Sequence, residues 1–377
     1  MKCVSALSTL SGTEAAFEDV LGRLAAGLSG TCADLAVAFV SADHAEDLAG
    51  LGRAILSRKI ARHVLACTAE SIIGDGREIE ESSAVSLWAV EMPGVQIKPL
   101  RLDLEDDRFP DDIAGESAGT LLMLGDPFTF PAEEWLNRLP AGIRAIGGMA
   151  SAAKAPGGNR LVLDDGEYDD GAIGVLLDSS AKVRAVVSQG CRPIGRSLIV
   201  TKVERNVIRE LGRRPAMEAL QELFESLEPA EQELVRGGLH LGRVINEYQE
   251  TFERGDFLVR NVLGTDGEGG IGVTDMIRVG QTVRFHVRDA ETADEELREL
   301  LAIPAKNAGS RAIGALVFSC NGRGTRLFAE ADHDATVVRE TLGPIPAAGF
   351  FAMGELGPVG DRNFVHGFTA SIAVFEE

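Results

Sequence analysis

The chain has 377 residues, of which 45% are hydrophobic and 25% charged, so it can bury a large core and is not expected to be disordered. Its length suggests two domains or three. The formal charge of −21 argues against non-specific nucleic-acid binding and against a membrane-surface protein held by basic residues, because phosphates would be repelled.

The apolar runs and the cysteines indicate where in the cell the protein is expected to work. No run of 18 or more apolar residues occurs, so we expect no transmembrane helix, and residues 3–10 predict a first strand rather than a signal peptide. The cysteines are odd in number, widely spaced and without a CxxC pair, which favours a reduced, cytoplasmic protein without a disulfide framework or zinc site. We predict no metal ligands and no cofactor. They are Cys3, Cys32, Cys67, Cys191 and Cys320.

A repeated order of elements is the most informative pattern in the chain. Residues 36–40 predict a buried strand, 46–58 a helix, 64–71 a second strand and 84–90 a third, with a glycine-rich, acidic loop before the last. The order returns at 120–125, 131–139, 145–152 and 172–178, and again at 315–319, 332–342, 346–355 and 367–375. The middle run of each copy contains small residues, which let another backbone or a ligand approach closely.

The segment between the second and third copies follows another pattern. Residues 183–188 and 198–203 predict a strand pair around a tight turn at 190–195, and 215–227 predict an amphipathic helix. Strands follow at 239–245 and 257–263, then a hairpin of 273–278 with 282–287, then a helix at 291–301. We place a boundary near residue 228, which divides the chain into domains 1–228 and 229–377. Together the elements predict an α/β (α+β) protein with mixed sheets built from strand-helix-strand-strand modules.

Two short motifs match catalytic or nucleotide-binding patterns, but their surroundings in the sequence argue against those functions. Residues 115–119 match GxSxG, but an acidic loop precedes the serine and a strand follows, whereas a nucleophile elbow needs a strand and then a helix. Residues 267–272 match GxGxxG, but the next segment predicts a strand, and two nearby carboxylates would repel a pyrophosphate. The acidic loops at 103–112 and 164–170 lack the EF-hand order, so we interpret them as solvated surface.

Three glycine-rich clusters are candidates for a binding site. In residues 189–195, Cys191 and Arg192 share a turn, and a neighbouring cation lowers the pKa of a thiol. Residues 319–324 follow a strand, where ligands of α/β sheets bind, and Asn321 and Arg323 offer hydrogen bonds and a planar fork for an anion. The alternative reading for each is a structural turn or an ordinary ion pair.

The third cluster spans residues 349–360 and 363–369. Glu355 is a lone acid in an apolar stretch and needs a partner, for which Arg323 is a candidate. His366 could bind a ligand or respond to pH, although a lone histidine beside apolar residues is more often structural.

These motifs together resemble the FIST proteins. The resemblance is carried by VLACTAESIIGDGREIEE, QGCRPIG, IVTKVERNVIRELGRRPAMEAL, FSCNGRG, GFFAMGELGPVG and NFVHGFTASIAVF, in that order along the chain. It implies an N-terminal FIST domain at about 34–227, a C-terminal one at about 239–372, and a sensory, signal-transduction role in which a small ligand such as an amino acid is bound. It implies no catalytic residues.

We therefore predict a cytoplasmic sensor, not an enzyme, that recognises an amino-acid-like ligand and signals through a partner protein or through a shape change between its domains. Arginine would hold the ligand's carboxylate, and Glu355 its ammonium or the arginine itself. Two alternatives remain open: an enzyme with Cys320 or Cys191 as nucleophile and His366 as base, and a pure interaction scaffold. The predicted ligand-binding residues are Cys191, Arg192, Cys320, Asn321, Arg323, Glu355 and His366.

Overall fold

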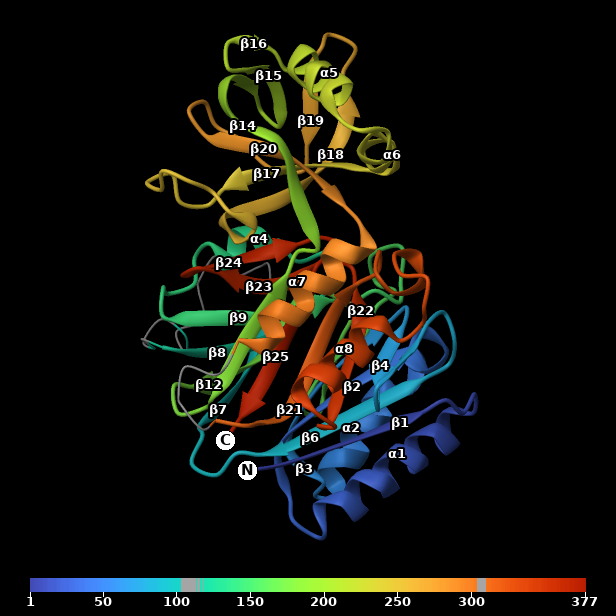
Figure 1. Cartoon of the computed structure of the whole chain (residues 1–377). Coiled ribbons are helices and arrows are strands. Elements are labelled where there is room, and N and C mark those ends of the chain that lie inside the picture. Colours follow the sequence, from blue (N-terminus) through green and yellow to red (C-terminus); the bar gives the residue numbers. More distant parts are fainter. Residues whose placement is uncertain (103–112, 114–115, 117, 304–309) are drawn as a thin grey trace. The chain divides into compact units, whose positions relative to one another are not determined.

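A computed structural model describes the chain except residues 103–112, 114–115, 117 and 304–309 (Figure 1). The acidic loop at 103–112 and two of the five GxSxG residues, 115 and 117, therefore lie outside the described residues. The chain divides into two compact units, one of Met1–Ser188 with Leu297–Glu377 and one of Gln189–Glu296. Residue 228, the predicted domain boundary, lies inside the second unit, so the compact units divide the chain at different places.

The first unit contains the three predicted copies, and the mixed α/β class is confirmed. In each copy a strand, a helix and a second, parallel strand are followed by a short hairpin and a last strand that is antiparallel to the first. The first copy and the elements before it are β1 (Lys2–Ser8), α1 (Thr13–Leu28), β2 (Ala33–Ser41), η1 (Ala42–Asp47), α2 (Leu48–Ser57), β3 (Ala61–Ala69), β4 (Ile72–Gly74), β5 (Arg77–Ile79) and β6 (Val85–Glu91).

The other two copies repeat this order. The second comprises β7 (Ile97–Leu102), β8 (Gly119–Gly125), α4 (Ala132–Leu136), β9 (Ile143–Met149), β10 (Leu161–Leu163), β11 (Gly166–Tyr168) and β12 (Ala172–Asp178). The third comprises β13 (Val183–Ser188), β21 (Ala312–Cys320), η3 (Gly324–Arg326), α8 (His333–Leu342), β22 (Ala347–Ala352), β23 (Glu355–Val359), β24 (Arg362–His366) and β25 (Ala370–Glu376). The second unit is thus an insertion into the third copy, after β13.

Each copy gives its hairpin to the sheet of another copy. The sheets run β1-β6-β2-β3-β10-β11, β7-β12-β8-β9-β23-β24 and β13-β25-β21-β22-β4-β5, so all three have the same plan. The first copy's hairpin joins the third sheet, the third copy's joins the second, and the second copy's joins the first. This corrects the prediction of a loop before the last strand in the first two copies: the segments are hairpins, because the neighbouring sheet edge supplies backbone partners that the sequence does not reveal.

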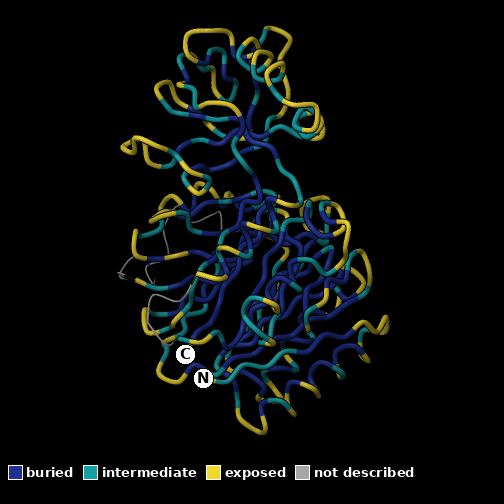
Figure 2. Tube along the Cα trace, viewed as in Figure 1, coloured by how far each residue is buried: buried dark blue, intermediate teal, exposed yellow. Residues whose placement is uncertain are grey.

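The inner faces of the three sheets share one core. Phe39, Phe318 and Phe350 meet there, with ring centroids 5.0–6.1 Å apart. Separate apolar clusters lie on the outer faces, where α1 and α2 cover the first sheet, α4 the second, and α8 with the end of α7 (Ala290–Ala302) the third (Figure 1). Strands covered on both faces explain the near-continuous apolar runs of the sequence, and Figure 2 shows them buried over most of their length.

The second unit is a small β-barrel. Its strands follow the order β14-β20-β17-β18-β19-β15-β16, and an additional β14–β15 pairing closes it around an apolar core. The predicted helix at 215–227 and strands at 239–245 and 257–263 are present. The elements are β14 (Cys191–Glu204), β15 (Val207–Leu211), β16 (Arg214–Pro215), α5 (Ala216–Ser226), α6 (Pro229–Gly237), β17 (Leu239–Val244), η2 (Arg254–Asp256), β18 (Phe257–Thr265), β19 (Ile271–Val273), β20 (Thr282–Arg288) and the start of α7.

Two predictions in this unit were wrong. Residues 190–195 are not a tight turn between paired strands, because β13 pairs with β25 while residues 191–204 form one long strand along β20 and β15. Residues 273–278 and 282–287 are not a hairpin, because β19 pairs with β18 and β15, and β20 with β17 and β14. In both cases the pairing partners are distant in sequence: β13 joins β25 in the third sheet, and β14, β19 and β20 join strands of the barrel. The GxGxxG match covers the end of the hairpin loop between β18 and β19 and the first two residues of β19, so a strand follows, as interpreted.

Candidate functional site

The FSCNGRG loop begins where β21 ends, and both neighbouring strands hold it. The amide of Cys320 donates to the carbonyl of Thr369 at 2.9 Å, and the amide of Asn321 donates to the carbonyl of Ala352 at 3.0 Å. Gly324 has φ +58°, and a Cβ there would lie 2.7 Å from a carboxylate oxygen of Glu80, so this bend requires glycine. Backbone hydrogen bonds and the required glycine therefore hold this loop in one conformation.

Arg323 turns inward from this loop and is completely buried. Its Nε and Nη2 donate to the two carboxylate oxygens of Asp334 at 2.8 and 2.7 Å, a bidentate pair to which Ser319 adds a 2.6 Å bond. The charge of Arg323 holds the pKa of Asp334 well below its usual range despite burial. Nη1 has no hydrogen-bond partner among the described residues, so one donor of a buried cation is unused.

A second buried acid comes from the first copy's hairpin. Glu78 accepts the amide of Ala335 at 2.9 Å in the first turn of α8, where a carboxyl group also interacts favourably with the helix dipole. Burial, and then the charge of Asp334, raise its pKa to about 8. The exchange of hairpins thus brings an acid from residue 78 beside an ion pair at residues 323 and 334.

Glu355 begins β23 and is also completely buried. Its Oε2 accepts the amide of Thr369 at 3.1 Å, and no nitrogen or oxygen donor of the described residues reaches Oε1. Burial raises the pKa of Glu355 to about 8, although the Thr369 amide, the Cys320 thiol and the charge of Arg323 act in the opposite direction. Hydrogen bonding links Glu355 to Thr369, but the bidentate partner of Arg323 is Asp334, which corrects the predicted partnership with Glu355.

His366 lies directly opposite Glu355 in the β23–β24 ladder and is buried. Its Nε2 is 3.0 Å from the carbonyl oxygen of Gly357. A carbonyl only accepts, so Nε2 carries the proton, and in the neutral ring Nδ1 holds the lone pair. This hydrogen bond fixes the orientation of the ring.

Five of the seven predicted residues therefore gather around the ends of β21 and β23 in the first unit. Cys320 and Asn321 are partly exposed above the buried side chains, which are those of Arg323, Glu355 and His366. Oδ1 of Asn321 is buried and has no hydrogen-bond partner among the described residues. The cluster therefore has a partly exposed rim over a charged interior.

The other two predicted residues belong to the second unit. Cys191 begins β14 and is buried. Arg192 forms two ion pairs, with Glu231 at 2.9 Å and Asp289 at 3.1 Å. These contacts agree with the alternative reading of Arg192 as a structural ion pair, and its role in ligand binding stays a prediction.

Sequence reasoning did not find Asp334, Glu78 or Thr369. Asp334 follows a helix start in the segment DHDATVV, which is a signal for capping but not for an ion pair with Arg323. Glu78 and Thr369 reach the cluster through strand pairing, which no local pattern announces. Among the residues that the structure describes, no group of three or more His, Cys, Asp or Glu side chains is arranged to hold a metal ion. None of the helices in this part of the chain has the length and apolar composition of a transmembrane span.

Comparison with known proteins identifies the class. Residues 34–214 match the FIST N domain and residues 216–358 the FIST C domain, so the chain belongs to the FIST family and the predicted resemblance is confirmed. FIST domains are associated with sensory and signal-transduction roles.

Mycobacterial relatives extend the similarity over nearly the whole chain. The uncharacterized protein Mb0898c of Mycobacterium bovis is 39% identical over 381 residues, which cover 99% of this chain and 98% of the relative. The uncharacterized protein MT0656 of Mycobacterium tuberculosis is 40% identical over 357 residues, 92% of each chain. The chain is similar to both along almost their full lengths.

Proposed function

We propose that this FIST protein is a sensor that binds an amino-acid-like ligand at the cluster of Asn321, Arg323 and Glu355. One observation carries the proposal: Nη1 of Arg323, Oε1 of Glu355 and Oδ1 of Asn321 are buried, and no nitrogen or oxygen of the described residues hydrogen-bonds to them, although the Cys320 thiol also interacts with the Glu355 carboxyl. Leaving such a group unsatisfied costs roughly 1–3 kcal/mol, more when it is charged. A ligand that supplied the missing bonds would recover this free energy on binding.

The unused groups match the two charged ends of an amino acid. Nη1 of Arg323 is a donor and suits a carboxylate. Oδ1 of Asn321 is an acceptor, and Oε1 of Glu355 becomes one when the carboxyl loses its proton, so both suit an ammonium group. The carboxylate of Asp334 is already engaged by Arg323 and Ser319, so it does not compete for the ammonium.

The surroundings of the loop favour a ligand with a cationic group. Arg326 donates to the carbonyl of Asn321 at 2.8 Å and pairs with Glu70 and Glu81 at 2.7 and 2.6 Å. Glu80 accepts the amide of Thr325 at 2.9 Å. Three carboxylates beside the loop therefore face one guanidinium of this loop, and the resulting negative potential attracts an ammonium.

Entry of the ligand requires movement of the loop, because Arg323 and Glu355 are closed off from solvent. Lifting residues 320–322 breaks the hydrogen bond from the amide of Asn321 to Ala352. A ligand that binds only the opened form shifts the population toward it, and a partner protein that recognises that form would receive the signal.

Binding is expected to release a proton. Glu355, with a pKa of about 8, is mostly protonated at neutral pH, and a ligand ammonium beside Oε1 would lower that pKa. Calorimetric titration at pH 7 in two buffers of different ionisation enthalpy would measure the release, and an amino acid that binds without releasing a proton would argue against contact with Glu355.

The direct test is a thermal-shift screen of the full chain with the common amino acids at millimolar concentration, followed by calorimetry of those that stabilise it. Asn321→Ala and Glu355→Gln should each weaken binding at least tenfold, whereas Asn137→Ala, at an exposed asparagine of the second copy, should not. Absence of stabilisation by any amino acid, or equal binding by the first two variants and the native chain, would refute the proposal.

A further inference from the structure

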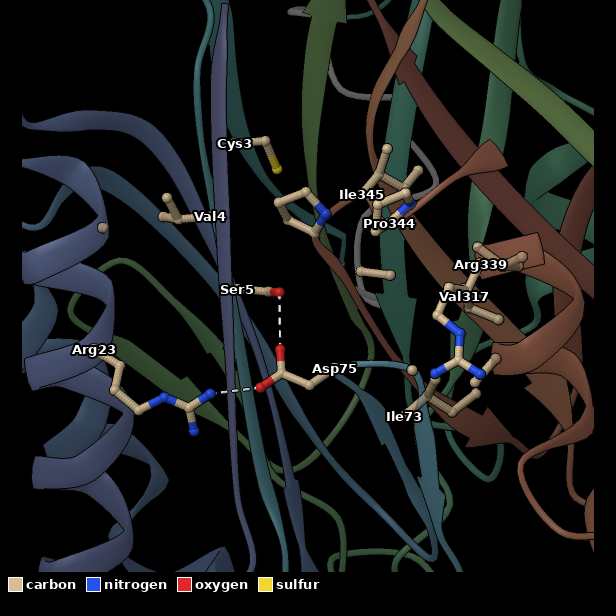
Figure 3. A pocket seen from close by; sticks show the side chains of 16 residues that line it. Cys3, Val4, Ser5, Arg23, Ile73, Asp75, Val317, Arg339, Pro344 and Ile345 are labelled. Carbon is tan, nitrogen blue, oxygen red and sulfur yellow. Dashed lines mark hydrogen bonds and ion pairs between the residues drawn. The ribbon is translucent and has the colours of Figure 1, made fainter. Parts of the chain in front are cut away.

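A cavity of about 400 Å³ lies in the first unit (Figure 3), and its lining does not include Asn321, Arg323 or Glu355. It is formed by β1 and α1, by the β4–β5 hairpin, and by α8 with the segment that leads into β22. Two copies of the repeat therefore contribute its walls. Its volume is in the range of small-molecule sites, which is roughly 300–1,000 Å³.

One end of the cavity is polar, and its carboxylate is already satisfied. Asp75 accepts hydrogen bonds from Ser5 Oγ at 3.1 Å, from the amide of Leu7 at 3.2 Å and from Arg23 at 2.6 Å. Arg23 also donates to the carbonyl of Leu7 at 2.7 Å. The Arg23–Asp75 pair is therefore electrically neutral, and no free carboxylate remains in the lining to hold a ligand ammonium.

The remaining charge in the lining is that of Arg339. Figure 3 shows Arg23 and Arg339 on opposite sides of Asp75, and Arg339 forms no hydrogen bond or ion pair with any of the described residues. Gly76, with φ +72°, lies under its guanidinium, since a Cβ there would be 3.2 Å from Nη1. Burial raises the pKa of the Cys3 thiol well above its usual range, so this thiol stays neutral. The lining thus carries one uncompensated positive charge.

The rest of the lining is apolar. Ile73, Val317 and Val338 are at most 2% exposed and form part of the cavity wall. Ile345, which is partly exposed, lines the cavity together with the prolines on both sides of it. An apolar wall beside a single free guanidinium suits a molecule with an apolar body and one anionic group.

We propose that this cavity is a second ligand site, which binds a small apolar molecule through one carboxylate or phosphate held by Arg339. The ligand differs in class from the amino acid of the proposed function, because the acid of this cavity is already neutralised by Arg23. The proposal is independent of the Arg323 cluster.

Octanoate and octyl phosphate are the probes, and n-octylamine is the control of opposite charge. Calorimetry with the full chain should show saturable binding of at least one of the two anions and none of the amine. Arg339→Gln should weaken that binding at least tenfold, because it removes a charge-assisted bond. Arg53→Gln, at an exposed arginine on α2, should leave it unchanged. The anion that binds more tightly shows whether the ligand of this cavity carries a carboxylate or a phosphate.

A second variant tests the cavity without depending on Arg339. Ile345→Glu adds a negative charge to the lining at a partly exposed position, so the fold should persist, as circular dichroism would verify, while anion binding is lost. Glu355→Gln should leave octanoate binding unchanged, which separates this site from the proposed amino-acid site. The inference is overturned if neither anion binds at millimolar concentration, if octylamine binds equally well, or if Arg339→Gln binds like the native chain.

Discussion

The two buried acids of the first unit should make its stability depend on pH in an unusual direction. The pKa values of Glu78 and Glu355 rise from an ordinary 4.5 to about 8 on folding. Between pH 4.5 and 8 the folded chain therefore holds protons that the unfolded chain releases, so the free energy of unfolding falls as pH rises through this window. Carboxylates in ordinary ion pairs have the opposite effect.

Glu355→Gln isolates one of these contributions. A shift from 4.5 to about 8 corresponds to on the order of 5 kcal/mol at about 1.4 kcal/mol for each pH unit. Glutamine resembles the protonated acid, so the variant should match the native chain near pH 5 and exceed its stability by several kcal/mol at pH 9. The double variant with Glu78→Gln should remove most of the remaining slope.

Urea denaturation followed by tryptophan fluorescence is a suitable assay, because both tryptophans, Trp88 and Trp135, lie in the first unit. Glu340→Gln, at a half-exposed ion pair with Arg298, is the control and should change stability by less than about 1 kcal/mol at any pH. If Glu355→Gln keeps the native slope between pH 5 and 9, the reasoning that burial holds this carboxyl protonated is refuted.

Three further outcomes are expected. Gly147→Ala places a Cβ 1.8 Å from a carbonyl oxygen of the neighbouring strand, so it should lower the free energy of unfolding in urea by ~3 kcal/mol or more. Gly50→Ala, which has open space around it, is the control and should not lower it. Equal effects of the two substitutions would contradict the packing argument. Phe350→Ala should cost ~3–5 kcal/mol, because a ring in contact with two other phenylalanines leaves a cavity, and a loss below 1 kcal/mol would mean that the core relaxes around it. Burial lowers the pKa of His240 and His286 to about 4, so the barrel should lose stability as pH falls from about 6.5 to 4. Hydrogen exchange of the backbone amides within residues 189–296 measures this stability. Protection factors that stay constant over that pH range would disprove the prediction.

The three-fold repetition was predictable because it rests on local patterns. The apolar runs at 36–40, 120–125 and 315–319 and the helices that follow them are visible in composition and spacing, and each is an element of the structure. The proximity of Glu355 to Arg323 was also predicted, because a buried acid needs a partner, although β21 and β23 belong to different sheets.

The hairpin exchange could not be predicted, because backbone hydrogen bonds between strands form with almost any residue type and so leave no pattern in the sequence. Residues 72–79 contain an acidic, glycine-rich turn that is typical of a solvated loop, yet they pair with β22 of the third copy. This pairing brings Glu78 to Ala335, more than 250 positions away. The partnership of Arg323 with Asp334 rather than Glu355 depends on how α8 packs, which sequence spacing leaves open.

By itself, the sequence determined the class of fold, the number of copies, the family and the loop that carries Cys320 to Arg323, because periodicity and turn chemistry act over a few residues. Tertiary structure alone decided which copy completes which sheet, which acid meets which arginine, and where Arg339 and its apolar wall enclose a cavity. The physical reason is that burial and charge are properties of the assembled surroundings: Glu355 is an ordinary carboxyl until folding removes water from it.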